Sequence, residues 1–306
     1  MALLSPGLAL FLYGVSSIPG AGTVESAKVL IPGIIGLLLI AAFGAHALRA
    51  ANPLIDLRLF QNRDLTIAVV TSTLFAVAFM GSMLLFPSYF LQVRGESTLS
   101  AGLLMAPQGL GAMLTMPLSG NLTDRIGPGK IVLSGIVVIA AGMAVFTQVT
   151  AASSYVLLLG ALFVMGLGMG MTMMPIMSAA LATLTDSQVA RGSTMMNIVQ
   201  QTAGSIGTAT MSVVLTGQVL ASPAATAYNA VTQGAVAAGK IPAPMLAAGR
   251  SALAHAFGHT YTVGLMLIIC CLIPAFFMPR RKVARDTALG EQPVSVEVTS
   301  AEGTGA

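Results

Sequence analysis

Eight long apolar runs, separated by short polar segments, constrain this 306-residue sequence more than any other feature. An α-helix rises about 1.5 Å per residue, so roughly 20 apolar residues are enough to cross the hydrocarbon core of a bilayer. Only 8% of the residues are charged, whereas soluble domains carry about 25%. We therefore expect an all-α integral membrane protein. The runs are Leu3–Ile18, Val29–Leu48, Leu65–Leu91, Ala101–Gly120, Ile131–Gln148, Tyr155–Leu181, Ser193–Leu220 and Tyr261–Met278.

The basic residues are distributed unequally between the two sides of such a bundle. Eight spans place both termini on one side, and ten of the 14 Lys and Arg residues fall on that side. Because basic loops are retained in the cytoplasm, we expect both termini to be cytoplasmic. The charges are scattered at span ends rather than gathered in a patch, which argues against a nucleic-acid partner. The ten residues are Arg49, Arg58, Arg63, Arg125, Lys130, Arg191, Arg280, Arg281, Lys282 and Arg285.

Composition divides the chain into four parts. Residues 1–50 hold two apolar runs joined by a Gly-rich loop, which predicts a transmembrane hairpin. Residues 51–64 alternate apolar and charged side chains, as a short amphipathic helix on the cytoplasmic membrane face would. Residues 65–282 hold six spans, and we expect a large loop over Ala221–Thr260 before the last of them. Residues 283–306 are small, polar and aperiodic, which predicts a disordered tail.

A short charged turn, GNLTDRIGPGK, separates two of the apolar runs. It resembles the G-x-L-x-D-R-x-G signature of major facilitator transporters, which lies in tight cytoplasmic loops between helix pairs. The resemblance implies a conformational latch, in which the carboxylate and the guanidinium pair with helix ends or across a bundle interface. The alternative is a solvated turn whose charges only set the topology. The latch residues would be Gly120, Asp124, Arg125, Gly127 and Lys130.

Further segments resemble one branch of that superfamily, the drug:proton antiporters with fourteen spans. NPLIDLRLFQNR (52–63) is similar to the linker into their second six-helix bundle, and SPGLALFLYGVS (5–16) to the hairpin inserted between their two bundles. LLFPSYFLQVRG (84–95), SAGLLMAPQGLGAMLTMPLSGNLTDRIGPGK (100–130) and MMNIVQQTAGSIGTA (195–209) follow in the order of the family. The resemblance implies a bacterial plasma (inner) membrane exporter of drugs or other amphipathic small molecules, represented here by its C-terminal portion.

The penultimate apolar run carries polar residues at steps of three or four, so they share one helix face. Polar groups in lipid need partners, so this face should point into the bundle, either as a substrate cavity wall or as a site of interhelical hydrogen bonds. The face consists of Asn197, Gln201, Ser205, Thr208 and Ser212. Tyr89 and Gln92, with Gln108 on the next span, are similar candidates. The predicted cavity residues are therefore Tyr89, Gln92, Gln108, Asn197, Gln201, Ser205 and Thr208.

The remaining chemical groups suggest neither a metal nor a cofactor. His255 and His259 have the i,i+4 spacing of a helical metal pair, but HAFGH lacks the Glu of a metalloprotease and Gly258 weakens the helix. We find no catalytic constellation near a membrane face, so we expect no enzyme. All ten acidic residues fall in loops, at span ends or in the tail. The chain therefore has no mid-membrane carboxylate for a proton relay.

Two functional hypotheses remain. The first is proton-coupled efflux by a fourteen-span antiporter of which this chain forms the second half, with a proton gradient as the energy source. The second is a truncated, non-transporting remnant, or a partner subunit that needs an N-terminal six-helix half in trans or a second copy of itself. In the antiporter family six helices precede the region that this chain resembles, so we expect the chain alone not to drive export. Its expected partners are membrane lipid and a small amphipathic substrate.

Overall fold

The computed structural model describes residues 4–17, 26–49, 63–181, 186–234 and 242–278, and every regular element in those ranges is a helix. Six stretches of the described residues are long and apolar enough to cross a membrane. They confirm the expected all-α, multi-pass membrane fold. These stretches are Arg63–Gln92, Thr98–Ile126, Pro128–Thr147, Tyr155–Leu181, Gly192–Leu220 and Pro244–Phe276.

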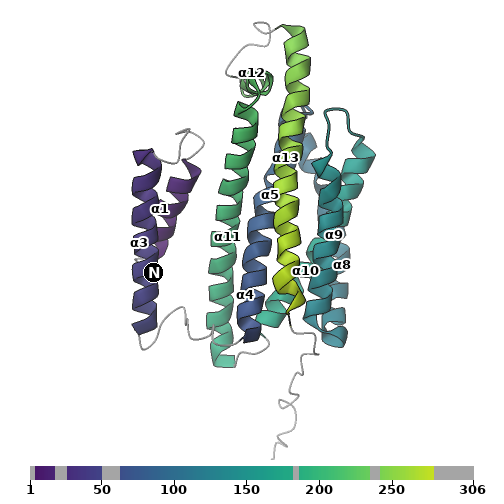
Figure 1. The fold of residues 1–306 in the computed structure, drawn as a ribbon. Coiled ribbons are helices and arrows are strands. Elements are labelled where there is room, and N and C mark those ends of the chain that lie inside the picture. Colours follow the sequence, from purple (N-terminus) through teal and green to yellow (C-terminus); the bar gives the residue numbers. More distant parts are fainter. Residues whose placement is uncertain (1–3, 18–25, 50–62, 182–185, 235–241, 279–306) are drawn as a thin grey trace, which may run out of the picture.

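The six spans stand side by side along one axis, and an N-terminal hairpin stands beside them (Figure 1). The hairpin consists of α1 (Leu4–Ser16) and α3 (Ala27–Arg49). Its α1 packs against α3 and also against α11 (Asp186–Leu220). Within α3, Val29–Leu39 is a shorter apolar segment. That both hairpin helices cross the membrane stays a prediction.

The first span of the bundle contains four helical segments that follow one another with little interruption. They are α4 (Arg63–Phe75), the π-helical segment η2 (Ala76–Met80), α5 (Gly81–Met83) and α6 (Leu85–Gln92). Pro87 has no backbone N–H to donate to the carbonyl four residues earlier, and α5 ends at that residue, Met83. The hydroxyl of the neighbouring Ser88 donates to the Leu84 carbonyl oxygen over 2.8 Å.

The next three spans pack around the glycines of α10 (Tyr155–Leu181). The second span is α7 (Thr98–Leu104) followed by α8 (Ala106–Ile126), and the third is α9 (Pro128–Thr147). A Cβ atom on Gly168 would lie 2.6 Å from the Gly135 carbonyl oxygen of α9. A Cβ atom on Gly170 would lie 2.7 Å from the Ala112 carbonyl oxygen of α8. Two faces of α10 thus touch two neighbouring backbones, which only small residues permit.

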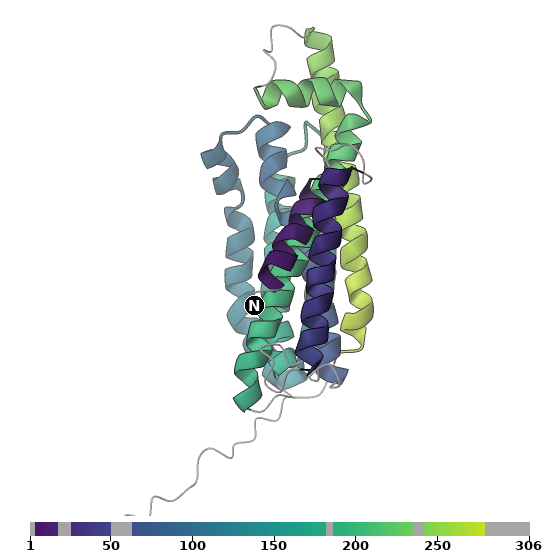
Figure 2. The same ribbon diagram turned by 90° about the vertical axis from the view of Figure 1, so that its left-hand side faces the viewer.

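The expectation of a large loop over Ala221–Thr260 is wrong. This region contains α12 (Pro223–Thr232), which lies across the top of the bundle (Figure 2), and the first half of α13 (Ala243–Phe276). The Gly and Pro residues suggested a loop, but Pro223 occupies the first turn of α12, where its missing N–H costs nothing. The Ala-rich remainder has high intrinsic helix propensity.

Two of the predicted segments fall largely or wholly outside the described residues. The surface linker over 51–64 is described only at Arg63 and Asp64, which form the first turn of α4. The tail over 283–306 lies outside entirely.

We name the two ends of the bundle by a residue that each contains. The Arg94 end comprises residues 93–97, between α6 and α7, and 148–154, between α9 and α10. The Asp124 end comprises residues 120–130, where α8 meets α9. Beneath the Arg94 end lies an aromatic core, in which the Phe86 ring of α6 is 4.9 Å from the Phe146 ring of α9 and 5.2 Å from the Tyr261 ring of α13.

Candidate functional site

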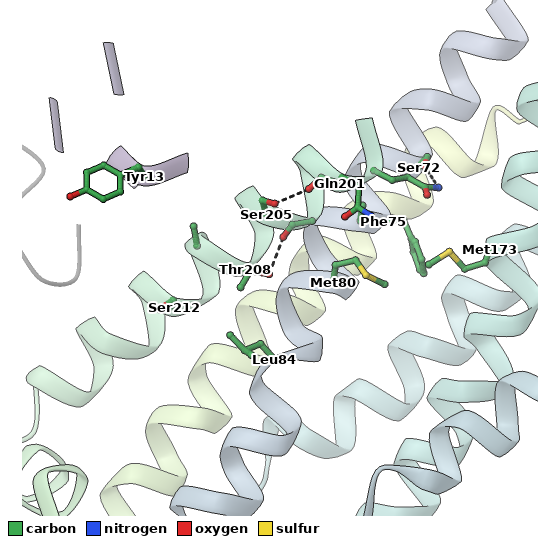
Figure 3. Close-up of a pocket in the computed structure, with 14 residues that line it drawn as sticks. Tyr13, Ser72, Phe75, Met80, Leu84, Met173, Gln201, Ser205, Thr208 and Ser212 are labelled. Carbon is green, nitrogen blue, oxygen red and sulfur yellow. Dashed lines mark hydrogen bonds between the residues drawn. The ribbon is translucent and has the colours of Figure 1, made fainter. Parts of the chain in front are cut away.

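A cavity of about 810 Å³ lies between the hairpin, the first span, α10 and α11 (Figure 3). Three of the predicted cavity residues, Gln201, Ser205 and Thr208, line it from α11, together with Ser212. The polar face of α11 therefore points into the cavity over this stretch. None of the 14 residues that line the cavity is Asp, Glu, Lys, Arg or His.

Two hydroxyl groups of the α11 wall, those of Ser205 and Thr208, are already engaged as donors. Ser205 donates to the Gln201 carbonyl oxygen over 2.9 Å, and Thr208 donates to the Gly204 carbonyl oxygen over 3.0 Å (Figure 3). The hydroxyl oxygens therefore face the cavity as acceptors, since each hydroxyl has one hydrogen to give. The exposed Gln201 amide adds both donors and an acceptor.

The opposite wall is mostly apolar and comes from the first span and from α10. Phe75, Met80 and Met173 provide aromatic and thioether surface there. One polar contact crosses from α11 to this side, because Gln200 donates from Nε2 to the Ser72 hydroxyl oxygen over 3.0 Å. Methionine side chains are flexible and polarisable, so such a wall adapts to ligands of different shape.

Close backbone contact sets the distance between the α11 wall and the first span. Gly207 of α11 lies against the carbonyl of Val77, inside the π-helical segment. A Cβ atom on Gly81 would lie 2.6 Å from the carbonyl carbon of Gly207. Ala76 and Met80 of the same π-helical segment line the cavity. The segment thus contributes both to the helix crossing and to the cavity surface, and π-bulges are frequent at functional sites.

Four of the predicted cavity residues do not line this cavity. Tyr89 is fully buried at the Arg94 end, where its hydroxyl donates to the Thr150 carbonyl oxygen over 2.7 Å. Gln92 is half-buried one turn further along α6. Gln108 is buried on α8, and Asn197 donates to the backbone of its own helix at Ser193. Helical spacing predicts which residues share a helix face. It does not predict at which depth of the bundle that face contacts another helix.

Other cavity residues were not predicted from the sequence. Ser72, Phe75 and Met80 belong to an apolar span with weak periodicity, and Tyr13 belongs to the hairpin. Gln200 is adjacent to the predicted face of α11 and turned out to be the residue that bonds to another span. The sequence signal for this side of the cavity was a polar residue, Ser72, within an apolar run.

The charged turn at the Asp124 end is as short as a helix-to-helix connection can be. Gly127 is the only residue between α8 and α9, and its φ of 89° lies in a region that favours glycine. Pro128 follows in the first turn of α9, where its fixed φ suits the start of a helix. The Gly-Pro pair thus explains the reversal of chain direction at this point.

The charged groups of this turn are open to solvent. Asp124, Arg125 and Lys130 are exposed, and none of their side chains makes a hydrogen bond or an ion pair with another described residue. A Cβ atom on Gly120 would meet nothing within 4 Å. The geometry therefore leaves these side chains available for contacts, and the latch stays a prediction.

The Arg94 end contains a polar network that sequence reasoning did not identify. Arg94 donates from Nη1 to the Ala151 carbonyl oxygen over 2.6 Å, and its guanidinium carbon lies 4.3 Å from the centre of the Tyr155 ring. The Tyr155 hydroxyl donates to Glu96, which also accepts from Ser100 over 2.6 Å. These hydrogen bonds, that of Ser100 first, lower the pKa of the Glu96 carboxyl below its usual range.

The same network reaches α13. Arg250 donates from Nε to the Val93 carbonyl oxygen over 2.8 Å. The two arginines therefore connect residues 93–97, residues 148–154 and α13, which are far apart in the sequence. The local signal was Gly95, between Arg94 and Glu96, whose φ of 72° turns the chain so that both side chains face α10.

Fold and cavity define a class: a multi-pass helical membrane protein with an uncharged, largely apolar cavity beside one bundle. The family model of the Major Facilitator Superfamily matches residues 1–208, and the chain belongs to this superfamily. Its members are transporters, so the chain is not an enzyme.

Several of the relatives are named as drug-resistance proteins, and others as uncharacterized transporters of the same superfamily. The chain is 45% identical over 302 residues to "Multidrug resistance protein B homolog" of Mycobacterium tuberculosis (strain ATCC 25618 / H37Rv), covering 94% of this chain and 56% of the relative. It is 26% identical over 272 residues to "Lincomycin resistance protein LmrB" of Listeria monocytogenes serovar 1/2a (strain ATCC BAA-679 / EGD-e), covering 89% and 55%. The chain thus spans little more than half the length of these relatives.

A solved structure, that of the nucleoside transporter NupG, aligns with a TM-score of 0.45 at 13% identity, over 84% of this chain and 63% of that one.

Proposed function

We propose that this chain forms the second half of a fourteen-span multidrug exporter that exchanges amphipathic small molecules for protons. The observation that carries the proposal is the cavity of about 810 Å³, with hydroxyl and amide groups on α11 and methionine and aromatic surface opposite. A ligand with an apolar body and a few hydrogen-bonding groups matches such a surface. The names of the relatives support drugs as the substrate class.

Proton coupling would have to use groups outside this cavity. A neutral polar wall binds a substrate, but Gln, Ser and Thr side chains do not titrate near neutral pH. We infer that the coupling carboxylate belongs to an N-terminal six-helix half, whether on the same polypeptide or on another. The alternative proposals keep the same cavity but differ in transport: a partner subunit would transport only with an N-terminal half in trans, and a truncated remnant would not transport at all.

A binding experiment tests the cavity. Purified protein in lipid nanodiscs is titrated with a fluorescent cationic dye, and polarisation is recorded. Gln201→Ala, which removes the exposed amide from the wall, should weaken dye binding about tenfold. Gln218→Ala is the matched control, because Gln218 is an exposed glutamine of the same helix that does not line the cavity. Equal effects of the two substitutions would place the binding site elsewhere.

A transport experiment separates a transporting half from a non-transporting remnant. The chain is reconstituted in sealed liposomes with an imposed pH gradient, alone or together with the six-helix half of a fourteen-span relative. Gradient-dependent dye movement only with both halves supports a transporting half, whether it is joined to an N-terminal half on one polypeptide or acts as a partner subunit. Movement by the chain alone contradicts the half-transporter, and absence of movement in both cases favours a remnant.

We also propose a bacterial plasma membrane location with both termini and the Asp124 end in the cytoplasm, on the distribution of basic residues. The test uses a variant without Cys270 and Cys271. In this background, the substitution Gln233→Cys at an exposed position should give a thiol that reacts with an impermeant reagent from outside. A cysteine at Lys130 should react only after permeabilisation, and the reverse pattern would contradict this orientation.

A further inference from the structure

A small polar pocket near the Arg94 end brings together groups that the transport proposal does not use. It has a volume of about 130 Å³ and lies between α13 and the carboxyl end of α9. Both His255 and His259 line it, and both are exposed. Thr147 and Thr150 line it from the other side.

The two imidazoles are placed as a pair by their helix. Positions i and i+4 of an α-helix lie on the same face, with Cβ atoms about 5–6 Å apart. Two such histidines are a recurrent metal-binding arrangement on helices. The spacing of the two histidines alone was weak evidence for a metal site. The pocket that both side chains line is a second, independent observation.

The residue between the histidines explains how α9 approaches. A Cβ atom on Gly258 would lie 2.9 Å from the Thr147 carbonyl oxygen, so a larger residue would displace the end of α9. Gly258, which weakened the metal hypothesis in the sequence, therefore lets the Thr147 carbonyl oxygen approach the helix that carries both histidines. Thr147 is the last residue of α9, and the last carbonyl groups of a helix have no partner within it.

The electrostatics of this position favour a cation. The carboxyl end of a helix carries a partial negative charge from its aligned peptide dipoles. Imidazole nitrogens suit zinc, copper and nickel ions, and oxygen atoms or water complete their coordination. A pocket of about 130 Å³ holds such an ion with several waters, since each water occupies about 30 Å³ in the liquid.

We propose that His255, His259 and the Thr147 carbonyl oxygen form a binding site for one divalent transition-metal cation. A bound ion would connect α13 to the carboxyl end of α9 and so stabilise the Arg94 end of the bundle. The site lies apart from the large cavity, with which it shares no residue. The inference therefore does not depend on the exporter proposal.

Calorimetric titration with Zn²⁺ tests the site on the full chain, purified without a histidine tag and stripped with a chelator. The wild-type protein should bind one Zn²⁺. His255→Gln and His259→Gln should each bind at least about tenfold more weakly. The matched control is His46→Gln, which removes the third histidine of the chain and should bind as the wild type does.

A thermal readout covers the case in which a variant folds poorly. Zn²⁺ should raise the unfolding midpoint of the wild-type protein and of His46→Gln, and excess chelator should reverse the shift, because a ligand that binds only the folded state stabilises it. Absence of both binding and a shift in the wild type would overturn the proposal. So would undiminished Zn²⁺ binding by His255→Gln and His259→Gln.

Discussion

At the Arg94 end, charged and phenolic side chains hold α6, α7, α10 and α13 together, whereas the charged side chains at the Asp124 end bond to no other described residue. Arg94 and Arg250 both donate to backbone carbonyl oxygens of distant segments. Asp124 and Arg125 are exposed within a turn that a single glycine closes.

The difference shows that similar charges serve different purposes at the two ends. At the Arg94 end, carbonyl groups left open at turns and helix ends receive charged donors, which stabilise this chain internally. At the Asp124 end, the Gly-Pro turn needs no side-chain support, so its charges are available to another bundle, to lipid head groups or to solvent. Substitutions at the first end should affect folding, and substitutions at the second should affect transport.

The largest expected effect is on transport. In a complete two-bundle transporter, Asp124→Asn or Arg125→Ala should reduce efflux about tenfold, because contacts that favour one conformation are lost. The unfolding free energy should change by less than about 0.5 kcal/mol, since neither side chain has a described partner. Efflux rates at equal protein levels measure the effect on transport, and thermal unfolding measures the effect on stability. Asn121→Ala, an exposed neighbour, is the control, and normal efflux by both variants would reduce the turn to a topological element.

The next effect is on stability. Arg94→Ala removes the hydrogen bond to Ala151 and the contact with the Tyr155 ring, and should lower the unfolding free energy by about 1–3 kcal/mol. Lys130→Ala removes an exposed cation at the other end and should change it by less than about 0.5 kcal/mol. Equal values for the two substitutions, measured by denaturation in detergent, would remove the distinction between the ends.

The smallest effect is a dependence on pH. Because the pKa of Glu96 is lowered in the folded protein, its charged form favours folding. The stabilisation is complete above the pKa of the unfolded chain, about 4.3, and is lost as the pH falls through the folded-state pKa below that value. Melting temperatures between pH 7 and pH 3 should show an acid-dependent decrease that Glu96→Gln reduces. An equally large decrease of the melting temperature in Glu96→Gln would show that other titratable groups cause the acid dependence.

The sequence predicted the features that depend on local composition. The six long apolar stretches became six helices because a backbone in lipid must satisfy its hydrogen bonds internally. The charged turn at Gly127 was predicted from its place between two apolar runs, and the structure shows that its glycine and proline, whose backbone preferences are local, reverse the chain there. The shared face of Gln201, Ser205 and Thr208 followed from helical periodicity.

Other features required contacts between distant residues. Tyr89 was predicted in a cavity and bonds instead to Thr150, 61 positions away. The Arg94 network joins residues between 57 and 157 positions apart, and no local pattern indicates such a pairing.

The amino-acid sequence by itself determined that this chain is a helical membrane protein and where its main spans lie, because the bilayer makes length and hydrophobicity decisive. Only the tertiary structure decided which polar side chains line the cavity, which hold the Arg94 end together and which stay exposed at the Asp124 end. The physical reason is that helix rotation and depth depend on how closely the helices pack, as at Gly81 and Gly207.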